Sequence, residues 1–358
     1  MLRVQVHNRS EWAEDLRHDW QELVQHSPSA TPFQTWEWQS TWWKHYGGTK
    51  RPHILGFYEG EDLVGLMPLY VSTGAWRALR AIGTGASDYL HPVCRRGHES
   101  GIAQALLEHL AERPAGDVID LHQVREDAPG SSLRSSQIQT IEQATCLVLD
   151  LPSTFDDYLK TLSKSLRYDV RRLDKSAFSE GGRIKAATPD NLDDALNVFF
   201  RTHRERWRKR GLPGAFGKKS ERFQREWAHI AARQGWLWLS TLQWQGESVG
   251  SIYAMRLGQV CYFYQAGFDP EAKAISPGTL LVARTIRRAI EEGLERFDFL
   301  RGDEPYKRRW KPQHAYKNLR FIKAGPSVRG DFAAAWNRLG WKVEERVRAR
   351  LEGRGLLG

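Results

Sequence analysis

The sequence predicts an α/β protein built from two similar units, each a mixed and mainly antiparallel sheet flanked by helices. With 358 residues, the chain is long enough for two domains of about 100–200 residues each. Strand-like and helix-like patterns follow the same order in both halves. A short stretch also recurs, because Glu59-Gly-Glu-Asp-Leu-Val-Gly resembles Gln245-Gly-Glu-Ser-Val-Gly. Recurring order with recurring letters indicates two copies of one α/β unit.

In the first half, alternating apolar residues predict strands and apolar residues with helical spacing predict helices. We expect a strand over 2–8, a helix that Ser10 caps, and a second, Trp-rich helix. The remaining elements are predicted at 53–58 and 63–71 (a hairpin), 78–82 (strand), 101–111 (helix), 118–122 (strand), 131–142 (helix) and 145–150 (strand).

The second half repeats this plan and ends with a short helix and a strand. Its elements are predicted at 183–187 (strand), 191–209 and 218–233 (helices), 236–244 and 248–257 (a hairpin), 260–268 (strand), 278–292 (helix) and 295–300 (strand). We therefore expect an N-terminal unit over 1–155 and a C-terminal unit over 183–330. A basic helical linker over 156–182 would join them, and 331–358 would form a basic C-terminal helix.

The net charge of +10 is unevenly distributed along the chain. Residues 160–225 carry a net charge of +10 and residues 301–358 carry +9, so the rest of the chain is acidic. This pattern favours an anionic ligand, such as cofactor phosphates, a nucleotide-linked sugar, RNA or a membrane surface. Solvated basic helix faces are the alternative.

Composition argues against several classes of protein. No apolar run reaches the roughly 18 residues that span a bilayer, and the N-terminus lacks the apolar core of a signal peptide. Three separated cysteines form neither a disulfide framework nor a Cys-x-x-Cys pair, and the 12 histidines lack metal-ligand spacing. We expect a cytoplasmic protein without a metal site.

The densest cluster of chemistry follows the predicted strand at 295–300. Gly302 and Pro305 break the extended chain there, and the segment carries the acids Asp303 and Glu304. The cations Arg301 and Lys307 and the phenol Tyr306 are also present. Ligands of open α/β sheets bind beyond the carboxyl ends of strands, so this is a candidate site. The alternative is a charged surface loop, in which Asp303 and Lys307 form an i, i+4 ion pair.

A second candidate site is the start of the helix predicted at 278–292. Ser276 is a candidate N-cap, and Pro277 suits the first helical position. Gly278 would allow a ligand to approach the backbone closely. The unpaired N–H groups and the positive end of the helix dipole would attract an anion. Any capped helix shares this property.

The second half resembles the GNAT acyltransferases. Within that superfamily it is most similar to the CelD-like acetyltransferases of bacterial polysaccharide biosynthesis, which are related to Fem-type aminoacyltransferases. The resemblance rests on Arg206-Trp207, Val249-Gly250-Ser251, Tyr264, Ser276-Pro277-Gly278 and the segment from Asp298 to Trp310. It covers nearly the whole chain, because these relatives also carry a tandem pair of GNAT-like units.

The resemblance implies transfer of an acyl group, in most relatives acetyl from acetyl-CoA, to an amine or hydroxyl of a saccharide or amino-sugar precursor. The pyrophosphate would bind backbone amides from Ser276 through Pro277 and Gly278 to Thr279. The strand that carries Tyr264, Ala266 and Gly267 would hold the pantetheine by backbone pairing. Gly278 stands without the usual glycine-rich loop, so the acyl chain and the donor stay open. A Fem-type enzyme would use an aminoacyl-tRNA, and a non-catalytic binding subunit is the third alternative.

Acyl transfer requires a base, a stabilised oxyanion and a proton for the leaving group. Asp303 or Glu304 would be the base, Lys307 would stabilise the oxyanion and Tyr306 would protonate the leaving sulfur. Asp298 is expected to anchor neighbouring backbone instead.

The first unit lacks a Tyr-Lys counterpart at its matching strand end, so we expect it to help form the groove for the acceptor. The candidate acceptor-binding residues of the first unit are Trp36, Trp38, Asp88 and Tyr89. Arg301 of the second unit is a further candidate. Core packing is the alternative for the tryptophans. The basic helix over 331–351 would dock onto the second unit through Phe332, Trp336, Leu339 and Val343, with peripheral membrane contact as the alternative.

Overall fold

The computed structural model describes residues 2–112, 115–134, 138–179, 181–209, 211, 214 and 216–353. The chain divides into two compact units. Unit 1 comprises Met1–Thr145 and Tyr316–Leu357, and unit 2 comprises Cys146–Ala315. These borders differ from the predicted borders at 155/156 and 330/331. No helix in the described part of the chain combines the length and the apolarity needed to cross a membrane.

The sheet of unit 1 has the strand order β1-β2-β3-β4-β6-β13, and β5 pairs with β3. Neighbouring strands are antiparallel except for the parallel pair β4 and β6. The strands are β1 (Arg3–His7), β2 (Arg51–Glu59), β3 (Asp62–Val71), β4 (Ala78–Ala81), β5 (Val93–Cys94), β6 (Val118–Arg125) and the part of β13 (His314–Ala324) from Tyr316 onward.

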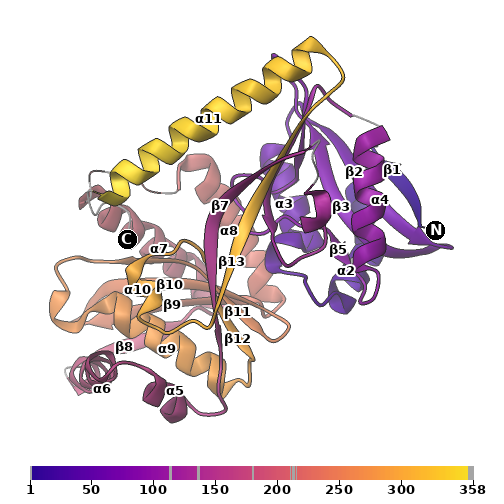
Figure 1. Cartoon of the computed structure of the whole chain (residues 1–358). Helices are drawn as coiled ribbons and strands as arrows, with labels where there is room; N and C mark the ends of the chain where they lie inside the picture. The colour runs from indigo at the N-terminus through magenta and orange to yellow at the C-terminus, as the bar shows by residue number, and fades with distance from the viewer. Residues whose placement is uncertain are drawn as a thin grey trace. The chain divides into compact units, whose positions relative to one another are not determined.

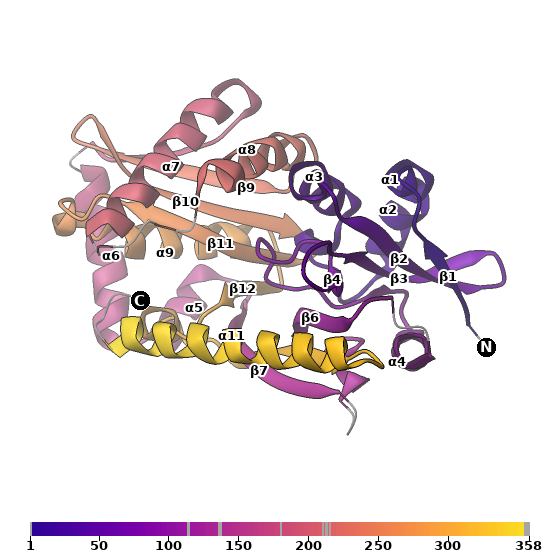
Figure 2. The ribbon, with the colours of Figure 1, turned by 90° about the horizontal axis from the view of Figure 1, so that it is seen from above.

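The helices of unit 1 lie on both faces of this sheet, as Figures 1 and 2 show. They are α1 (Trp12–Asp15), α2 (Arg17–His26), α3 (Trp36–Tyr46), α4 (Glu99–Glu112) and α11 (Val328–Gly353). The helix predicted from Ser10 is thus two helices, and its first turn is not capped by a side chain. The core under α4 is mainly aliphatic and includes Ile102, Leu106 and Leu121.

Unit 2 has the strand order β7-β12-β11-β10-β9-β8. Again neighbouring strands are antiparallel except for one parallel pair, β11 and β12. The strands are β8 (Arg183–Ala186), β9 (Leu237–Trp244), β10 (Glu247–Leu257), β11 (Val260–Phe268), β12 (Arg296–Arg301) and the part of β7 (Gln139–Asp150) from Cys146 onward.

Two helices of unit 2 cover one face of its sheet, and further helices cover the other face (Figure 2). The first pair is α7 (Leu192–Lys209) and α8 (Lys218–Arg233). The opposite face carries α5 (Phe155–Thr161), α6 (Lys164–Ser179) and α9 (Pro277–Glu291), and the short α10 (Pro305–Arg308) follows β12. Leu166, Val170 and Ile286 belong to one core cluster on this face. Residues 156–182 therefore pack as part of unit 2.

The two units share one topology, which confirms the predicted fold class. In each, helices separate the first two strands, three antiparallel strands follow, and one helix leads to a strand parallel to its predecessor. The last strand of each sheet is exchanged along the chain. β7 follows β6 in the chain but pairs with β12, and β13 follows β12 in the chain but pairs with β6.

Two sequence predictions are wrong in this fold. The helix expected over 131–142 is a short 3-10 turn, Ser131–Leu133, and the start of strand β7. The β-branched residues Thr140 and Ile141 favour the strand. The face of α11 expected to pack is exposed, whereas its small residues are buried on unit 1, because Ala333 and Ala334 belong to a cluster with Ile322.

Candidate active site

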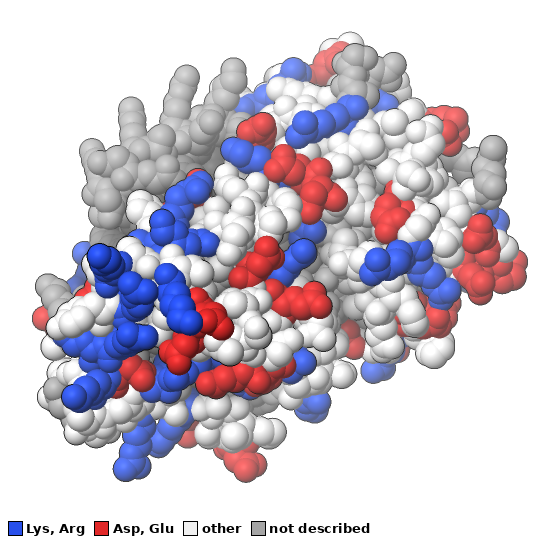
Figure 3. Space-filling model, turned by 60° about the horizontal axis from the view of Figure 1, so that its bottom comes forward, with Lys and Arg blue, Asp and Glu red and all other residues white. Residues whose placement is uncertain are grey.

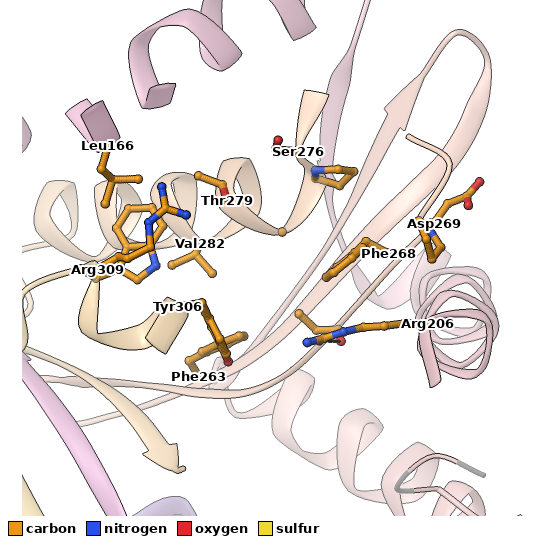
Figure 4. A pocket seen from close by; sticks show the side chains of 15 residues that line it. Leu166, Arg206, Phe263, Phe268, Asp269, Ser276, Thr279, Val282, Tyr306 and Arg309 are labelled. Carbon is orange, nitrogen blue, oxygen red and sulfur yellow. Dashed lines mark hydrogen bonds between the residues drawn. The ribbon is translucent and has the colours of Figure 1, made fainter. Parts of the chain in front are cut away.

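A cavity of about 340 Å³ lies in unit 2 at the start of α9. Its walls come from α6, α7, β11, α9 and the segment after β12. Figure 4 shows the side chains around it. The lining residues are Leu166, Arg206, Phe263, Ala266, Phe268, Asp269, Pro270, Ser276, Pro277, Gly278, Thr279, Val282, Tyr306, Arg309 and Trp310.

The cavity exists because the parallel strands β11 and β12 separate. They pair from Val260 with Arg296 to Tyr262 with Asp298, and no further pairing joins them among the described residues. β11 nevertheless continues to Phe268, paired with β10 along its other edge. The edge of β11 that faces away from β10 therefore leaves β12 after Tyr262. The carbonyl of Ala266 on this edge accepts a hydrogen bond from Arg206 Nη1 at 3.1 Å.

A β-bulge sets which side chains of β11 line the cavity. Tyr253 pairs with Gln265 and the next residue, Ala254, pairs with Phe263, so Tyr264 is the extra residue. An extra residue shifts the alternation of side chains by one position. Without the extra residue, Phe263 would lie on the opposite face of β11 from Ala266 and Phe268. With it, all three side chains line the cavity.

Tyr264 belongs to a different environment. Its hydroxyl accepts a hydrogen bond from Gln224 Nε2 of α8 at 2.9 Å, and its ring lies 5.7 Å from that of Tyr253. Because α8 covers the face opposite α9, Tyr264 does not line the cavity, in contrast to its predicted role. Gly267 does not line it either. A Cβ there would come within 2.4 Å of the backbone nitrogen of His203, so Gly267 allows β11 to pack closely against α7.

The start of α9 forms one rim of the cavity. Ser276 is the N-cap residue, with the left-handed backbone φ of 42°, and its side chain makes no cap hydrogen bond. This differs from the capping role that the sequence predicted. Pro277 is the first helical residue, and Gly278 lies close to Phe268, since a Cβ would be 3.1 Å from its ring. The first-turn amides and the dipole of a 15-residue helix thus lie at the rim.

Two arginines lie on opposite sides of the cavity, with Ser276 and Thr279 along the rim between them (Figure 4). Arg206 comes from α7, and its guanidinium lies 4.7 Å from the centre of the Phe268 ring. Arg309 follows α10 and lies 3.8 Å from Asp169 of α6. Asp269 is the one acid among the lining residues. The balance of charge favours an anionic ligand.

The turn after β12 is held by Lys307. Its Nζ donates to the carbonyls of Arg301 at 2.5 Å and Gly302 at 3.3 Å, and it lies 3.0 Å from Glu304 Oε2. The side chain is only 5% exposed. Lys307 is therefore a structural residue of this turn, because its donors are directed at the turn itself.

Asp298 also stabilises this turn. Its Oδ1 accepts the backbone N–H of Leu300 at 2.7 Å, and Leu300 has a left-handed φ of 55°. The pairing of β12 with β7 is irregular at the same place, between Asp298 and Arg301. The carboxylate thus supports a bulge, which re-aims the chain towards α10. This is the anchoring role predicted for Asp298.

Of the four predicted catalytic residues, Tyr306 alone lines the cavity. Asp303 is exposed and forms an ion pair with Arg308, at 2.5 Å between Oδ1 and Nε. The ion pair between Asp303 and Lys307, which belonged to the alternative interpretation of this segment, is not the pairing that forms: Asp303 pairs with Arg308 instead. Glu304 pairs with Lys307 inside the turn.

Five of the seven predicted cofactor-binding residues line the cavity, namely Ala266, Ser276, Pro277, Gly278 and Thr279. The predicted acceptor-binding residues are differently placed. Trp38, Asp88 and Tyr89 are at most 5% exposed in unit 1, so they are not available as walls of a groove. Trp36 is half-buried beneath Arg17, and Arg301 is exposed at the end of β12.

Sequence reasoning missed most of the apolar walls and both arginines as site residues. One signal was present: Tyr306, Arg309 and Trp310 have the i, i+3, i+4 spacing of one helical face. Phe263 and Phe268 carried no such signal, because the bulge between them changes the alternation.

Comparisons with known proteins agree with this geometry. The family described as Acetyltransferase (GNAT) domain matches residues 164–308. No curated protein sequence matches the chain.

Among solved structures, that of FemX superposes with a TM-score of 0.63 and 11% identity, covering 90% of this chain and 97% of that one. The C-terminal domain of a putative lysylphosphatidylglycerol synthetase from Agrobacterium fabrum gives 0.56 and 10%, covering 90% and 96%. L-PGS from Bacillus licheniformis gives 0.52 and 16%, covering 87% and 96%.

These superpositions show a shared fold over most of the chain. The family match places a GNAT acetyltransferase domain at residues 164–308, the stretch that contains α7, β11, α9 and β12. Residues 164–308 of the second unit therefore match a GNAT acetyltransferase domain, which supports an acyltransferase activity for the protein.

Proposed function

We propose that this protein transfers an acyl group from an acyl-CoA thioester to an amine or hydroxyl of a saccharide or amino-sugar precursor. Acetyl-CoA is the simplest donor. The observation that carries the proposal is the cavity in which the start of α9, two arginines and the diverging edge of β11 come together. No metal takes part, and the expected setting is the cytoplasm.

The walls of the cavity match the parts of an acyl-CoA. Its phosphates are anionic, and the amides of Gly278 and Thr279 with Arg206 and Arg309 offer donors and positive charge. Its pantetheine arm is extended and carries amides, which suits pairing with a strand edge such as that of β11. The floor, formed by Phe263, Val282 and Trp310, is apolar, which suits an uncharged acyl group.

Tyr306 is the proposed acid for the leaving sulfur. It is a residue of α10, and its phenol lines the cavity beside the apolar floor. The turn that holds Tyr306 is rigid. Lys307 bonds two carbonyls on one side of it, and Tyr158 donates to the carbonyl of Trp310 at 2.9 Å on the other. The general base stays a prediction: Asp303 and Glu304 are the candidates, and each is paired with a cation.

The acceptor class is proposed from the resemblance to CelD-like enzymes, and Trp38, Asp88 and Tyr89 are buried and do not contribute to it. Arg301, exposed at the end of β12, remains as a candidate contact.

An aminoacyl-tRNA donor is the second candidate function, and the surface of α6 favours it. Figure 3 shows Lys and Arg gathered over unit 2 on the side of α5 and α6. On α6 the exposed basic residues are Lys164, Arg171, Arg172 and Lys175. The cavity argues against this donor, because an aminoacyl group carries an ammonium. Arg206 and Arg309 would repel that charge, and Asp269 is the one acid among the lining residues.

Thermal unfolding with and without CoA tests the donor. We expect CoA to raise the Tm, and an acetyl-CoA assay with amino sugars and nucleotide sugars to release free thiol. Tyr306→Phe should lower kcat and leave CoA binding unchanged. Absence of any CoA effect, together with binding of tRNA that weakens steeply with salt, would replace the acyl-CoA donor by the tRNA donor. CoA binding without turnover of any acceptor would favour a binding subunit.

A further inference from the structure

Helix α11 exposes a stripe of large apolar residues. Val328, Phe332, Trp336 and Leu339 are 86%, 61%, 55% and 56% exposed. These positions recur at intervals of four, four and three residues, so they share one side of the helix. In the sequence, Val343 continues the same spacing. An ordinary surface helix places polar residues on its outward face, and α11 does the opposite.

The inward face of α11 consists of small residues and is firmly docked on unit 1. A Cβ at Gly330 would lie 2.7 Å from the carbonyl oxygen of Asp117, so the helix approaches the backbone closely. Ala333 and Ala334 are buried, and Asn337 Oδ1 accepts from Arg80 Nη2 at 3.2 Å. This docking fixes the orientation of the helix and turns the large residues away from the core of unit 1.

The exposed aromatic rings form an ordered cluster with Trp76, which precedes β4. The rings of Phe332 and Trp336 are stacked, with centroids 6.5 Å apart. Trp76 contacts each of them edge to face at 6.1 Å. Three aromatic side chains from two segments of unit 1 thus form one outward surface, which we call the aromatic ridge.

Arginines border the aromatic ridge. The side chains of Arg77 and Arg329 are 62% and 60% exposed and share one acidic partner, Asp117, at 3.5 and 3.7 Å, and Arg338 is exposed further along α11. Asp331 is the one acid among the exposed residues of α11 from 328 to 340. Trp and Phe with neighbouring Arg are the residues that helices use to lie in the headgroup region of an anionic bilayer.

We propose that the aromatic ridge binds the surface of an anionic lipid bilayer, with α11 parallel to the membrane plane. The stripe from Val328 to Leu339 extends about 17 Å along the helix, so it offers a line of insertion rather than a compact patch. This shape and the bordering arginines favour a lipid surface over a second copy of the chain. The contact would hold the enzyme at a membrane without crossing it.

Co-sedimentation of the full chain with vesicles tests the proposal. We expect binding to vesicles of phosphatidylcholine with about 30% phosphatidylglycerol, and at least severalfold weaker binding to phosphatidylcholine alone. The double variant Phe332→Ser/Trp336→Ser should lose most of this binding. Ala335→Ser, on the same helix, is the matched control and should bind like the parent protein.

Circular dichroism and the Tm verify that each variant keeps its fold, which is expected because the docked face of α11 is unchanged. Equal binding by the double variant and the parent, or no binding to anionic vesicles, would overturn the proposal. So would a dimer in light scattering that the double variant dissociates, because the ridge would then be a protein interface. Acyl transfer to a soluble acceptor should not change in the double variant, so this test is independent of the proposed reaction.

Discussion

The two units share a topology, but the gap between their parallel strands differs. In unit 1, β4 pairs with β6 at Ala78–Val118 and Leu79–Ile119, and no further pairing joins them in the described residues, as with β11 and β12 in unit 2. The chain after β4 then fills the space beside β6. Leu90 is 3% exposed and its N–H donates to the carbonyl of Gln123 at 2.8 Å. The same fold thus gives a filled gap in one unit and a cavity in the other.

The helices that follow these strands differ in the same way. The first turn of α4 is preceded by Gly97, whose N–H donates to the carboxylate of Glu99 at 2.8 Å. An acid of the chain therefore occupies the position where a helix attracts an anion. At α9 the side chain of the N-cap residue makes no cap hydrogen bond, and arginines border the N-terminus instead. The connection from β4 to α4, residues 82–98, is longer than the connection from β11 to α9, residues 269–276. The longer connection fills the gap in unit 1.

Filling the cavity should have the largest effect on CoA binding. Thr279→Trp places an indole at the rim, on the third residue of α9, and we expect CoA affinity to fall at least about 100-fold, which corresponds to about 2.7 kcal/mol. Calorimetric titration with CoA measures this loss. Ser100→Trp, in the first turn of α4, is the matched control and should bind CoA normally. A normal CoA affinity in Thr279→Trp would show that the donor does not bind in this cavity.

Emptying the filled gap of unit 1 should destabilise the protein without creating a site. Leu90→Ala removes a buried side chain, and such changes cost about 2–5 kcal/mol. Urea unfolding measures the change in the free energy of unfolding. We expect this variant to keep one CoA site per chain, and a second site would show that unit 1 is a latent donor domain.

The two cavity arginines should contribute less than the shape of the cavity. Arg206→Ala and Arg309→Ala should each weaken CoA binding about 10-fold, since hydrogen bonds to charged groups contribute about 1.5–3 kcal/mol and solvent screens Arg309. The affinity of the parent protein should also fall with salt. Arg171→Ala on α6 serves as the control. A 10-fold loss in that variant would shift the anion site to α6.

Acid pH should weaken both units by the smallest amount. Burial and, secondarily, nearby arginines lower the pKa of His203 in unit 2 and of His91 in unit 1 to about 3. Between pH 6.5 and 3 the unfolded chain binds more protons at these histidines, so stability falls as the pH is lowered. From pH 6.5 to 5.5 each contributes about 1 kcal/mol. Urea unfolding at both pH values checks this, and His203→Gln should lose less stability on acidification than the parent.

The order of the elements was predictable because it follows from local pattern and from the repeat. Much of the cavity rim at the start of α9 was also predictable, since Pro277 and Gly278 carry a strong local signal. The exchange of β7 and β13 was not, because strand pairing between distant segments leaves no mark in local periodicity.

The side chains of the site were less predictable than its location. Lys307 and Tyr306 are neighbours in sequence, but one is buried in the turn and the other lines the cavity, because α10 directs successive side chains to different sides. The bulge at Tyr264 likewise moves that residue away from the site. Such local irregularities are decided by tertiary packing, which sequence spacing does not contain.

Calorimetric titration of the full chain with CoA, read for its stoichiometry, decides whether the cavity of unit 2 is the one donor site. We predict one site per chain in the parent protein and in Leu90→Ala, and none in Thr279→Trp. Two sites per chain, or a single site that persists in Thr279→Trp and is lost in a variant of unit 1, would contradict it.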